Sequence, residues 1–195
     1  QQSFKENLEI INSQIKQIEN LVNEFSDFAR MPKPIFKRNN LVKLLNDNIK
    51  LLSEVNKSIE INLNKKDEEI LLECDKEQIS RVFINLIKNS IESIEQKVEK
   101  NPDFKKKILI DISSNNDHIL ISIEDNGVGF DKSNIKEILN PYYTTKKNGT
   151  GLGLSIVNKI INDHKGELEF IPTNNGAKIQ IRFYFNDNRN INSWW

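Results

Sequence analysis

The stretch ILIDISSNNDHILISIEDNGVG, residues 108–129, decides the fold that we predict for this chain. Isoleucine recurs at every second position from Ile108 to Ile112 and again from Ile119 to Ile123. This alternation predicts two half-buried strands, joined by a polar turn from Ser113 to Asp117. A polar segment with two glycines follows the second strand directly. A loop of this kind at a strand end is where binding residues often lie.

Further helices and strands are predicted on both sides of this pair of strands. Amphipathic patterns predict helices over residues 40–53, 75–98 and 152–161, with Asp75 as the N-cap of the second. Short apolar or alternating runs predict strands over residues 59–63, 70–72, 167–171 and 178–185. Strands and helices mixed in this order predict an α+β sandwich, with one mixed sheet and helices packed on one face.

The first thirty residues carry a different pattern. Their apolar residues are spaced alternately four and three apart, at Phe4, Leu8, Ile11, Ile15, Ile18, Val22, Phe25 and Ala29. This spacing is typical of the seam of a coiled coil or helical bundle. The helix should end near Arg30, because Pro32 and Pro34 follow it. Such a helix would not be stable alone in water, so we expect partner helices from upstream sequence or from a second chain.

Composition narrows the class of protein. The 195 residues suffice for one domain and an appendage, and the start at Gln1 indicates a piece of a longer protein. Lysine plus arginine and aspartate plus glutamate both total 28, so the basic surplus of a nucleic-acid-binding protein is missing. No apolar run approaches the ~20 residues of a membrane span. The single cysteine, Cys74, suits a reducing compartment and is interpreted as a small buried residue.

The first motif whose side chains could bind a ligand is Asn85-Leu86-Ile87-Lys88-Asn89. Asn85 and Asn89 are four residues apart, so both project from one face of the predicted helix. An amide oxygen is a hard ligand that suits Mg²⁺, and Lys88 could lie beside a phosphate. Paired asparagines on a solvated helix face are also common in an asparagine-rich chain, and this alternative stays open.

The second motif is Asp125-Asn126-Gly127-Val128-Gly129. A carboxylate at a strand end can accept a hydrogen bond from an exocyclic amine, as in adenine, whereas guanine offers an oxygen at that position. Gly127 and Gly129 allow sharp turns and a close approach of a ligand. The alternative is an ordinary Asx turn.

Two more motifs lie further along the chain. In Gly149-Thr150-Gly151-Leu152-Gly153-Leu154-Ser155, bare backbone amides at a helix start would form a phosphate cradle. The segment lacks the ending of a P-loop and the leading strand of a dinucleotide-binding site. In Pro141-Tyr142-Tyr143-Thr144-Thr145-Lys146-Lys147, aromatic, hydroxyl and cationic side chains predict a lid over phosphates. The alternative for this last motif is a surface loop anchored by a tyrosine pair.

The four motifs, in this order, resemble the N, G1, F and G2 boxes of sensor histidine kinases. Asn174-Asn175-Gly176-Ala177 stands where the last glycine turn of that family would be. The stretch Phe25 to Pro34 further resembles the NtrY-like and NtrB-like nitrogen-sensing branch. The resemblance implies a Bergerat-type GHKL fold that binds ATP and Mg²⁺.

The resemblance also implies roles for single residues. Asn89 would bind Mg²⁺ with Asn85 and Lys88 beside it, and Asp125 would read adenine in a site shaped by Gly127 and Gly129. The lid would comprise Tyr143, Thr144, Thr145 and Lys146, with Lys146 touching phosphate. The phosphate cradle would comprise Gly149, Thr150, Gly151, Leu152, Gly153 and Leu154.

The same resemblance implies a domain organisation and partners. Residues 1–31 would be the second helix of the dimerisation and histidine phosphotransfer domain, and residues 32–39 a linker. Residues 40–186 would be the catalytic ATP-binding domain, followed by a polar tail over 187–195. It implies a homodimer through the N-terminal helix and a response-regulator receiver domain as partner. This region would be cytoplasmic, with membrane attachment only through upstream segments.

Two alternative functions remain open at this point. GHKL ATPases and serine kinases resemble one another in placing a glutamate where this chain has Asn85, and an amide is not a base at neutral pH. A degenerate module would bind nucleotide without transferring phosphate. Neither histidine has the context of a phosphoacceptor, because His118 opens a strand. His164 lies near a helix end, where the helix dipole favours a cation and Gly166 would be the C-cap.

Overall fold

The computed structural model describes residues 2–99, 104–130, 137–144 and 149–185. The predicted polar tail, residues 187–195, lies outside these ranges. In chain order, the elements are α1 (Gln2–Ala29), β1 (Lys37–Asn40), α2 (Leu41–Val55), β2 (Glu60–Lys65), β3 (Leu71–Cys74), α3 (Lys76–Val98), β4 (Lys107–Ser114), β5 (His118–Asp125), α4 (Gly153–Asp163), β6 (Gly166–Thr173) and β7 (Gly176–Tyr184). Each helix and strand predicted from the apolar patterns is present, with ends shifted by a few residues.

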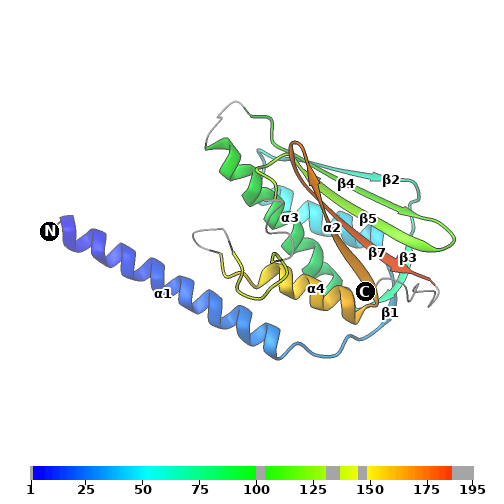
Figure 1. Cartoon of the computed structure of the whole chain (residues 1–195), viewed down its shortest axis with the longest axis horizontal. Helices are drawn as coiled ribbons and strands as arrows, with labels where there is room; N and C mark the ends of the chain where they lie inside the picture. Colours follow the sequence, from blue (N-terminus) through cyan, green and yellow to red (C-terminus); the bar gives the residue numbers. More distant parts are fainter. Residues whose placement is uncertain (1, 100–103, 131–136, 145–148, 186–195) are drawn as a thin grey trace.

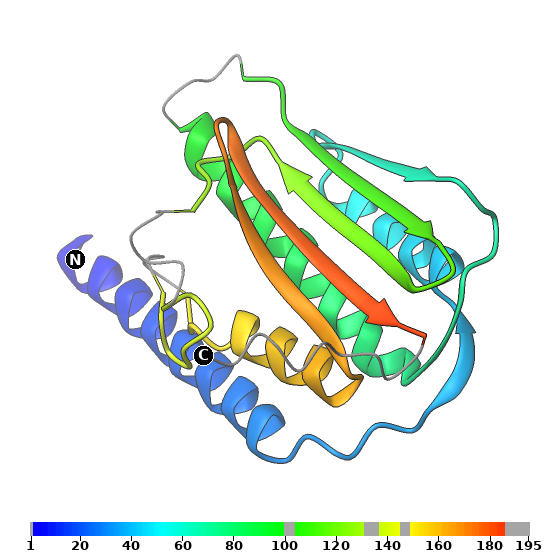
Figure 2. The same cartoon turned by 45° about the vertical axis from the view of Figure 1, so that its right-hand side comes forward.

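The main sheet has five strands in the order β2-β4-β5-β7-β6. Strands β2 and β4 are parallel and the other neighbours are antiparallel, so the predicted mixed sheet is confirmed. Helices α2, α3 and α4 cover one face of this sheet (Figures 1 and 2). A row of paired residues, Ile112, Ile121 and Ile181, contributes to the core beneath them. The other face is polar and carries the cross-strand ion pairs Lys178–Glu124 and Arg182–Glu169.

Helix α3 is the central helix of the domain and packs against both α2 and α4. It begins where predicted, because Oδ1 of Asp75 accepts a hydrogen bond from the Gln78 backbone N–H at 3.1 Å. Its fully buried stripe comprises Ile79, Val82, Phe83, Leu86 and Ile87. Full burial of one such side chain contributes about 1.5–3 kcal/mol, so this stripe fixes the helix firmly on the sheet.

The segment predicted as a plain linker ends in a strand. Strand β1 pairs antiparallel with β3, which forms a small second sheet. Its sequence, Lys-Arg-Asn-Asn, has no apolar alternation, and for this reason the pattern missed it. Cys74, at the end of β3, is buried, and burial raises the pKa of its thiol to about 11. The thiol therefore stays protonated at neutral pH, in agreement with its predicted structural role.

The linker is anchored to the start of α3 by polar contacts. The Gln78 amide donates to the carbonyl of Pro32 at 3.0 Å, and the backbone N–H of Ile35 donates to Oδ2 of Asp75 at 2.8 Å. The Phe36 ring lies 5.2 Å from the ring of His164 at the end of α4. The linker therefore has one defined path along the ends of two helices.

His164 corrects one expectation from the sequence. Its Nε2 accepts a hydrogen bond from the Asp75 backbone N–H at 3.0 Å, so the ring proton is on Nδ1, which donates to the carbonyl of Ile160 at 2.8 Å. The residue is thus a buried neutral imidazole and not a cation. The predicted C-cap was also wrong, because Lys165 has the positive φ of 57° at this helix end and Gly166 begins β6.

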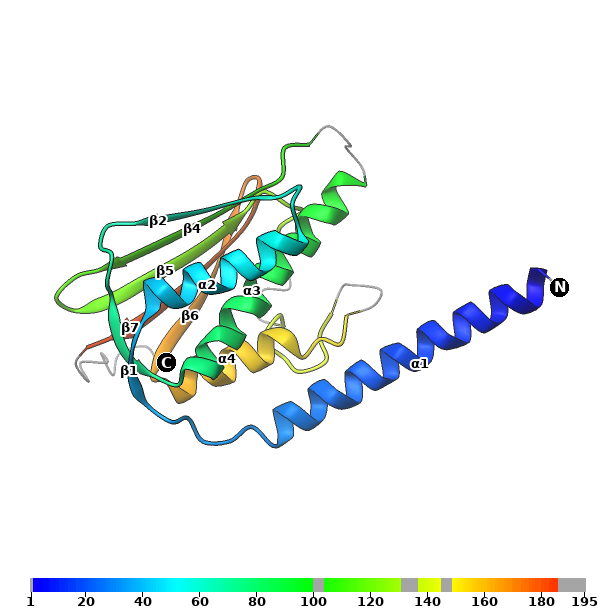
Figure 3. The same cartoon turned by 180° about the vertical axis from the view of Figure 1, so that it is seen from behind.

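Helix α1 extends away from the sandwich (Figures 1 and 3). Its apolar seam is exposed, and the exposed fraction of the large seam residues lies between 44% for Leu8 and 69% for Phe4. Within the described residues, no helix is long and apolar enough to cross a membrane. The exposed seam agrees with the expectation that α1 requires partner helices.

Gly176 offers a test of how closely the loops of the sheet approach one another. Its φ is 128°, and an added Cβ would lie 1.9 Å from the carbonyl oxygen of Asp125. We expect Gly176→Ala to lower the free energy of unfolding by at least ~2 kcal/mol, measured by denaturant titration. Gly153→Ala is the control, because its Cβ would meet only Asn85 Oδ1, at 3.8 Å. Equal stability of the two variants would contradict this packing.

Candidate nucleotide site

A cavity of about 400 Å³ lies between α3, the end of β5 and the start of α4. Most of the predicted site residues line it: Asn85, Lys88, Asn89, Asp125, Gly129, Tyr143, Thr144, Gly149, Thr150, Gly151, Gly153 and Leu154. Thr145 and Lys146 lie outside the described residues. Leu152 is fully buried in the core. The fold therefore brings predicted residues from Asn85 to Leu154, distant in the sequence, into one site.

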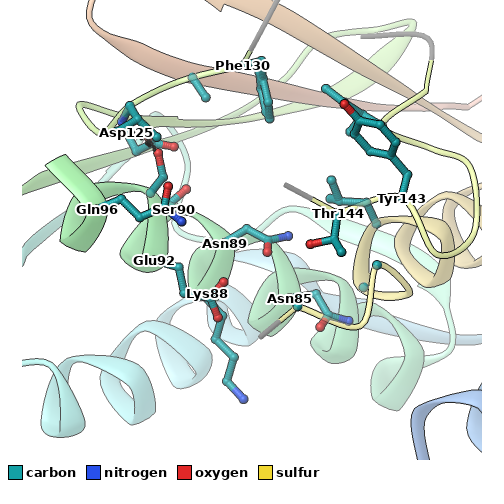
Figure 4. Close-up of a pocket in the computed structure, with 18 of the residues that line it drawn as sticks. Asn85, Lys88, Asn89, Ser90, Glu92, Gln96, Asp125, Phe130, Tyr143 and Thr144 are labelled. Atoms are coloured by element: carbon teal, nitrogen blue, oxygen red, sulfur yellow. Dashed lines mark hydrogen bonds between the residues drawn. The ribbon is translucent and has the colours of Figure 1, made fainter. Parts of the chain in front are cut away.

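Asp125 is at one end of the cavity, at the last position of β5 (Figure 4). Its side chain is only 6% exposed. Oδ1 accepts hydrogen bonds from the backbone N–H of Gly127 at 2.9 Å and from the Ser93 hydroxyl at 3.3 Å. Burial raises the pKa of Asp125, and the hydrogen bonds from Gly127, Ser90 and Ser93 offset part of this effect. A buried acceptor in this state would gain from a ligand that donates a hydrogen bond.

The glycines after Asp125 bring the backbone close to its neighbours. An added Cβ on Gly127 would lie 2.3 Å from the Ser93 hydroxyl, so only glycine lets the loop lie against α3. Gly129 has a φ of 79°, and its Cβ would lie 2.5 Å from the carbonyl oxygen of Gly176. Gly127 thus shapes the site by packing on the helix, whereas Gly129 also lines the cavity.

The asparagine pair lies on the face of α3 that borders the cavity. The half-buried Asn89 extends its amide toward the space between Asp125 and Thr144 (Figure 4). Asn85 lies beside the start of α4, where an added Cβ on Gly153 would be 3.8 Å from its Oδ1. Lys88 is exposed, and its side chain points away from these groups (Figure 4). Asn89 is therefore the amide best placed to reach a ligand.

The start of α4 provides an electropositive wall. Helix geometry leaves the first-turn amides of α4 without acceptors inside the helix, and the N-cap residue Leu152 provides no side-chain cap. Gly151, at a φ of 71°, accepts a backbone hydrogen bond at 3.0 Å from Tyr142, which itself has a φ of 69°. This contact holds the predicted lid beside the helix start. Amides and helix dipole together favour an anion here.

Several lining residues were not predicted from the sequence. Ser93 continues the stripe of Asn85 and Asn89 by one more helical turn, so extending the four-residue spacing would have found it. Ser90 is buried beside Asp125 (Figure 4). Phe130 forms an apolar wall, because its ring meets Phe170 edge to face at 5.4 Å. No local signal marks Phe130, since its role depends on the strand order.

Comparison with known proteins identifies the family. The model for the family described as "Histidine kinase-, DNA gyrase B-, and HSP90-like ATPase" matches residues 74–187, more than half of the chain. The chain therefore belongs to this family, and its sandwich is the predicted GHKL fold.

Individual relatives narrow the comparison. Sporulation kinase E of Bacillus subtilis is 34% identical over 82% of this chain and 21% of its own length. A putative NtrY-like sensor histidine kinase of Rickettsia conorii is 35% identical over 92% of this chain and 29% of its own. The predicted resemblance to NtrY-like sensor kinases is thus confirmed. The chain spans between about a fifth and a third of the length of these relatives.

Solved structures of the histidine kinase ThkA have the same fold. Its nucleotide-free catalytic domain is 28% identical, with a TM-score of 0.68 over 77% of this chain and 95% of that one. ThkA in complex with the response regulator TrrA is 22% identical, with a TM-score of 0.74 over 94% of this chain and 52% of that one. The longer match includes most of α1 as well as the sandwich.

Asp125→Asn tests the electrostatic state of the site. The pKa of Asp125 is raised in the fold, so this carboxyl group stabilises the folded state most below its unfolded pKa of about 4, and the contribution is lost as pH rises through the folded pKa. The variant should therefore unfold at a higher denaturant concentration than wild type at about pH 7. The difference should shrink as the pH falls toward about 4.

The control for this experiment is Asp117→Asn, which removes one carboxylate from an exposed turn. Both variants are compared with wild type by denaturant titration without nucleotide. A wild type that is more stable than Asp125→Asn at neutral pH would show that burial of this carboxylate is fully compensated in the fold.

Proposed function

We propose that this chain is the ATP-binding catalytic region of a two-component sensor histidine kinase. It transfers the γ-phosphoryl group of ATP to a histidine on a separate helix, for relay to an aspartate of a response regulator. The observation that carries the proposal is the cavity itself. Along its length lie the buried carboxylate of Asp125, the amide of Asn89 and then Asn85, which is beside the start of α4 (Figure 4). We assign these three parts to the base, the metal and the phosphates.

Asp125 would select the base of the nucleotide. Its carboxylate can accept a hydrogen bond from the exocyclic amine of adenine, whereas the oxygen of guanine at that position would meet it with like charge. The buried position excludes water that could otherwise relieve the mismatch. Phe130 and Ile179 line the cavity near this end and offer apolar surface for the ring.

The residues around Asn89 fit a magnesium ion. Among the described residues, no group of three or more histidine, cysteine, aspartate or glutamate side chains could hold a metal. Mg²⁺ suits such a site, because it is commonly held by one or two protein oxygens together with phosphates and water. Asn89 would supply the protein oxygen, and the ion would neutralise phosphate charge when bound.

The chain's own contribution to transfer would be positioning. Asn85 occupies the position at which the ATPases with this fold have a glutamate. Its amide cannot take up a proton at neutral pH. A histidine acceptor needs no such base, because its ring nitrogen is already a nucleophile. The bond from the γ-phosphorus to the bridging oxygen breaks, a phosphorus–nitrogen bond forms, and ADP leaves. The α4 amides would stabilise the charge on the phosphates.

Neither histidine of this chain suits the acceptor role. Both ring nitrogens of His164 are engaged in hydrogen bonds inside the fold. His118 begins β5, whereas Asp125 ends it, so they are seven positions apart along the strand, or roughly 23 Å. The acceptor would thus lie on a helix outside residues 1–195.

The partners follow from α1 and from the relatives. The exposed seam of α1 supports a homodimer through a helical bundle, with α1 as the second helix of the dimerisation domain. The ThkA complex with TrrA supports a response regulator as the other partner. We place this region in the cytoplasm, with membrane attachment only through upstream segments.

Asn89→Ala tests the metal assignment. We expect the variant to keep its fold, as measured by circular dichroism. The factor by which Mg²⁺ increases the affinity for ATP should fall by about tenfold or more. Calorimetric titrations of ATP with and without Mg²⁺ measure this effect. Asn46→Ala, on the exposed face of α2, is the matched control. Unchanged Mg²⁺ dependence in Asn89→Ala would remove Asn89 from the metal site.

Phosphoryl transfer is tested with radiolabelled ATP. The chain alone should remain unlabelled, whereas a supplied helical domain that carries the acceptor histidine should gain acid-labile label. The rate should rise steeply with the concentration of that domain, because the two parts are no longer linked. Label on the chain alone would make His118 or His164 an acceptor. An unlabelled acceptor despite measurable ATP binding would favour a nucleotide-binding module without kinase activity.

A further inference from the structure

Lys97, in the last turn of α3, contacts the loop that follows Asp125. Its Nζ donates hydrogen bonds to two consecutive carbonyls, of Asn126 at 2.8 Å and of Gly127 at 3.0 Å. The same ammonium lies 4.6 Å from the centroid of the Phe104 ring, a cation–π distance. The side chain is partly buried, so these contacts are shielded from water.

Both peptide groups that Lys97 contacts lead to the same oxygen of Asp125. The peptide with the Asn126 carbonyl has its N–H on Gly127, and this N–H donates to Oδ1 of Asp125 at 2.9 Å. The next peptide has its N–H on Val128, which donates both to the Ser93 hydroxyl at 3.1 Å and to the Ser93 carbonyl at 3.2 Å. That hydroxyl donates to the same Oδ1 at 3.3 Å. Two series of hydrogen bonds thus connect the ammonium group of Lys97 with Oδ1 of Asp125.

We propose that Lys97 is a positioning residue for nucleotide recognition and acts through Asp125. A cation on a carbonyl polarises the whole peptide group, so the N–H on its other side becomes a stronger donor. Both series therefore hold Oδ1 and fix the orientation of the carboxylate. The orientation matters because a hydrogen bond to a base requires a defined acceptor direction.

Lys97 is not the only residue that holds this loop in place. Asn126 is already fixed to the neighbouring strand, because its amide donates to the carbonyl of Lys105 at 2.7 Å and accepts from the N–H of Lys107 at 3.0 Å. The backbone N–H of Asn126 also donates to the carbonyl of Lys107 at 3.3 Å. The contribution specific to Lys97 is the charge placed on the two carbonyls.

The inference rests on the proposed function, since it assumes that the base of the nucleotide lies at Asp125. A double-mutant cycle separates the two claims. The dissociation constant for ADP without metal is measured by calorimetry for wild type, Lys97→Met, Asp125→Asn and the double variant. Methionine keeps the apolar stem without the charge, and Lys97→Gln, which keeps donors, replaces it should Lys97→Met fail to fold. Lys50→Met, on the exposed surface of α2, is the control.

We expect Lys97→Met to weaken ADP binding by roughly fivefold or more in the wild-type background and by less than about twofold in the Asp125→Asn background. Lys97→Arg should restore most of the affinity, because it keeps the charge and the ring contact. An equal loss in both backgrounds, or no loss in either, would overturn the role of Lys97. If wild type does not bind ADP, or if Asp125→Asn binds it as wild type does, the proposed function fails first.

Discussion

The structure depends on the burial of one face of α3 against the five-stranded sheet. The apolar stripe that includes Phe83 and Leu86 fixes the rotation of this helix. Once that rotation is fixed, the adjoining stripe of Asn85, Asn89 and Ser93 must line the cavity. Core packing and the nucleotide site are therefore two results of one constraint. A substitution that rotated the helix to relieve the core would displace every polar group on this adjoining stripe.

Backbone proximity is the second requirement of the site. The loop after β5 lies directly on α3 and on the turn before β7, and the lid segment lies on the start of α4. Each contact is closed by a glycine: Gly127 at the helix, Gly176 at the turn and Gly151 at the lid. Side chains at these positions would push the segments apart, and the cavity would lose its shape before any ligand contact was lost.

Features that follow from a local pattern could be predicted from the sequence. Features that depend on contacts between distant segments could not. The strands around Ile110 and Ile121 and the cap at Asp75 follow from period and capping chemistry, and four ordered motifs pointed to one cavity. Strand β1 was missed because its polar residues gain order only by pairing with β3. The neutral state of His164 was missed because its hydrogen-bond donor lies 89 residues away.

Because the linker is anchored to the start of α3, a change in backbone direction just after α1 would rotate the whole domain. Only Arg30 and Met31 stand between the end of α1 at Ala29 and the bound carbonyl of Pro32. From the anchor at the start of α3, the helix runs about 20 Å to Asn89, at about 1.5 Å per residue. A rotation of about 10° at these two residues would thus move Asn89 through roughly 3–4 Å. That arc is comparable to the length of a hydrogen bond, so in the proposed kinase a small change in the direction of α1 would bring a phosphate into or out of reach of an acceptor.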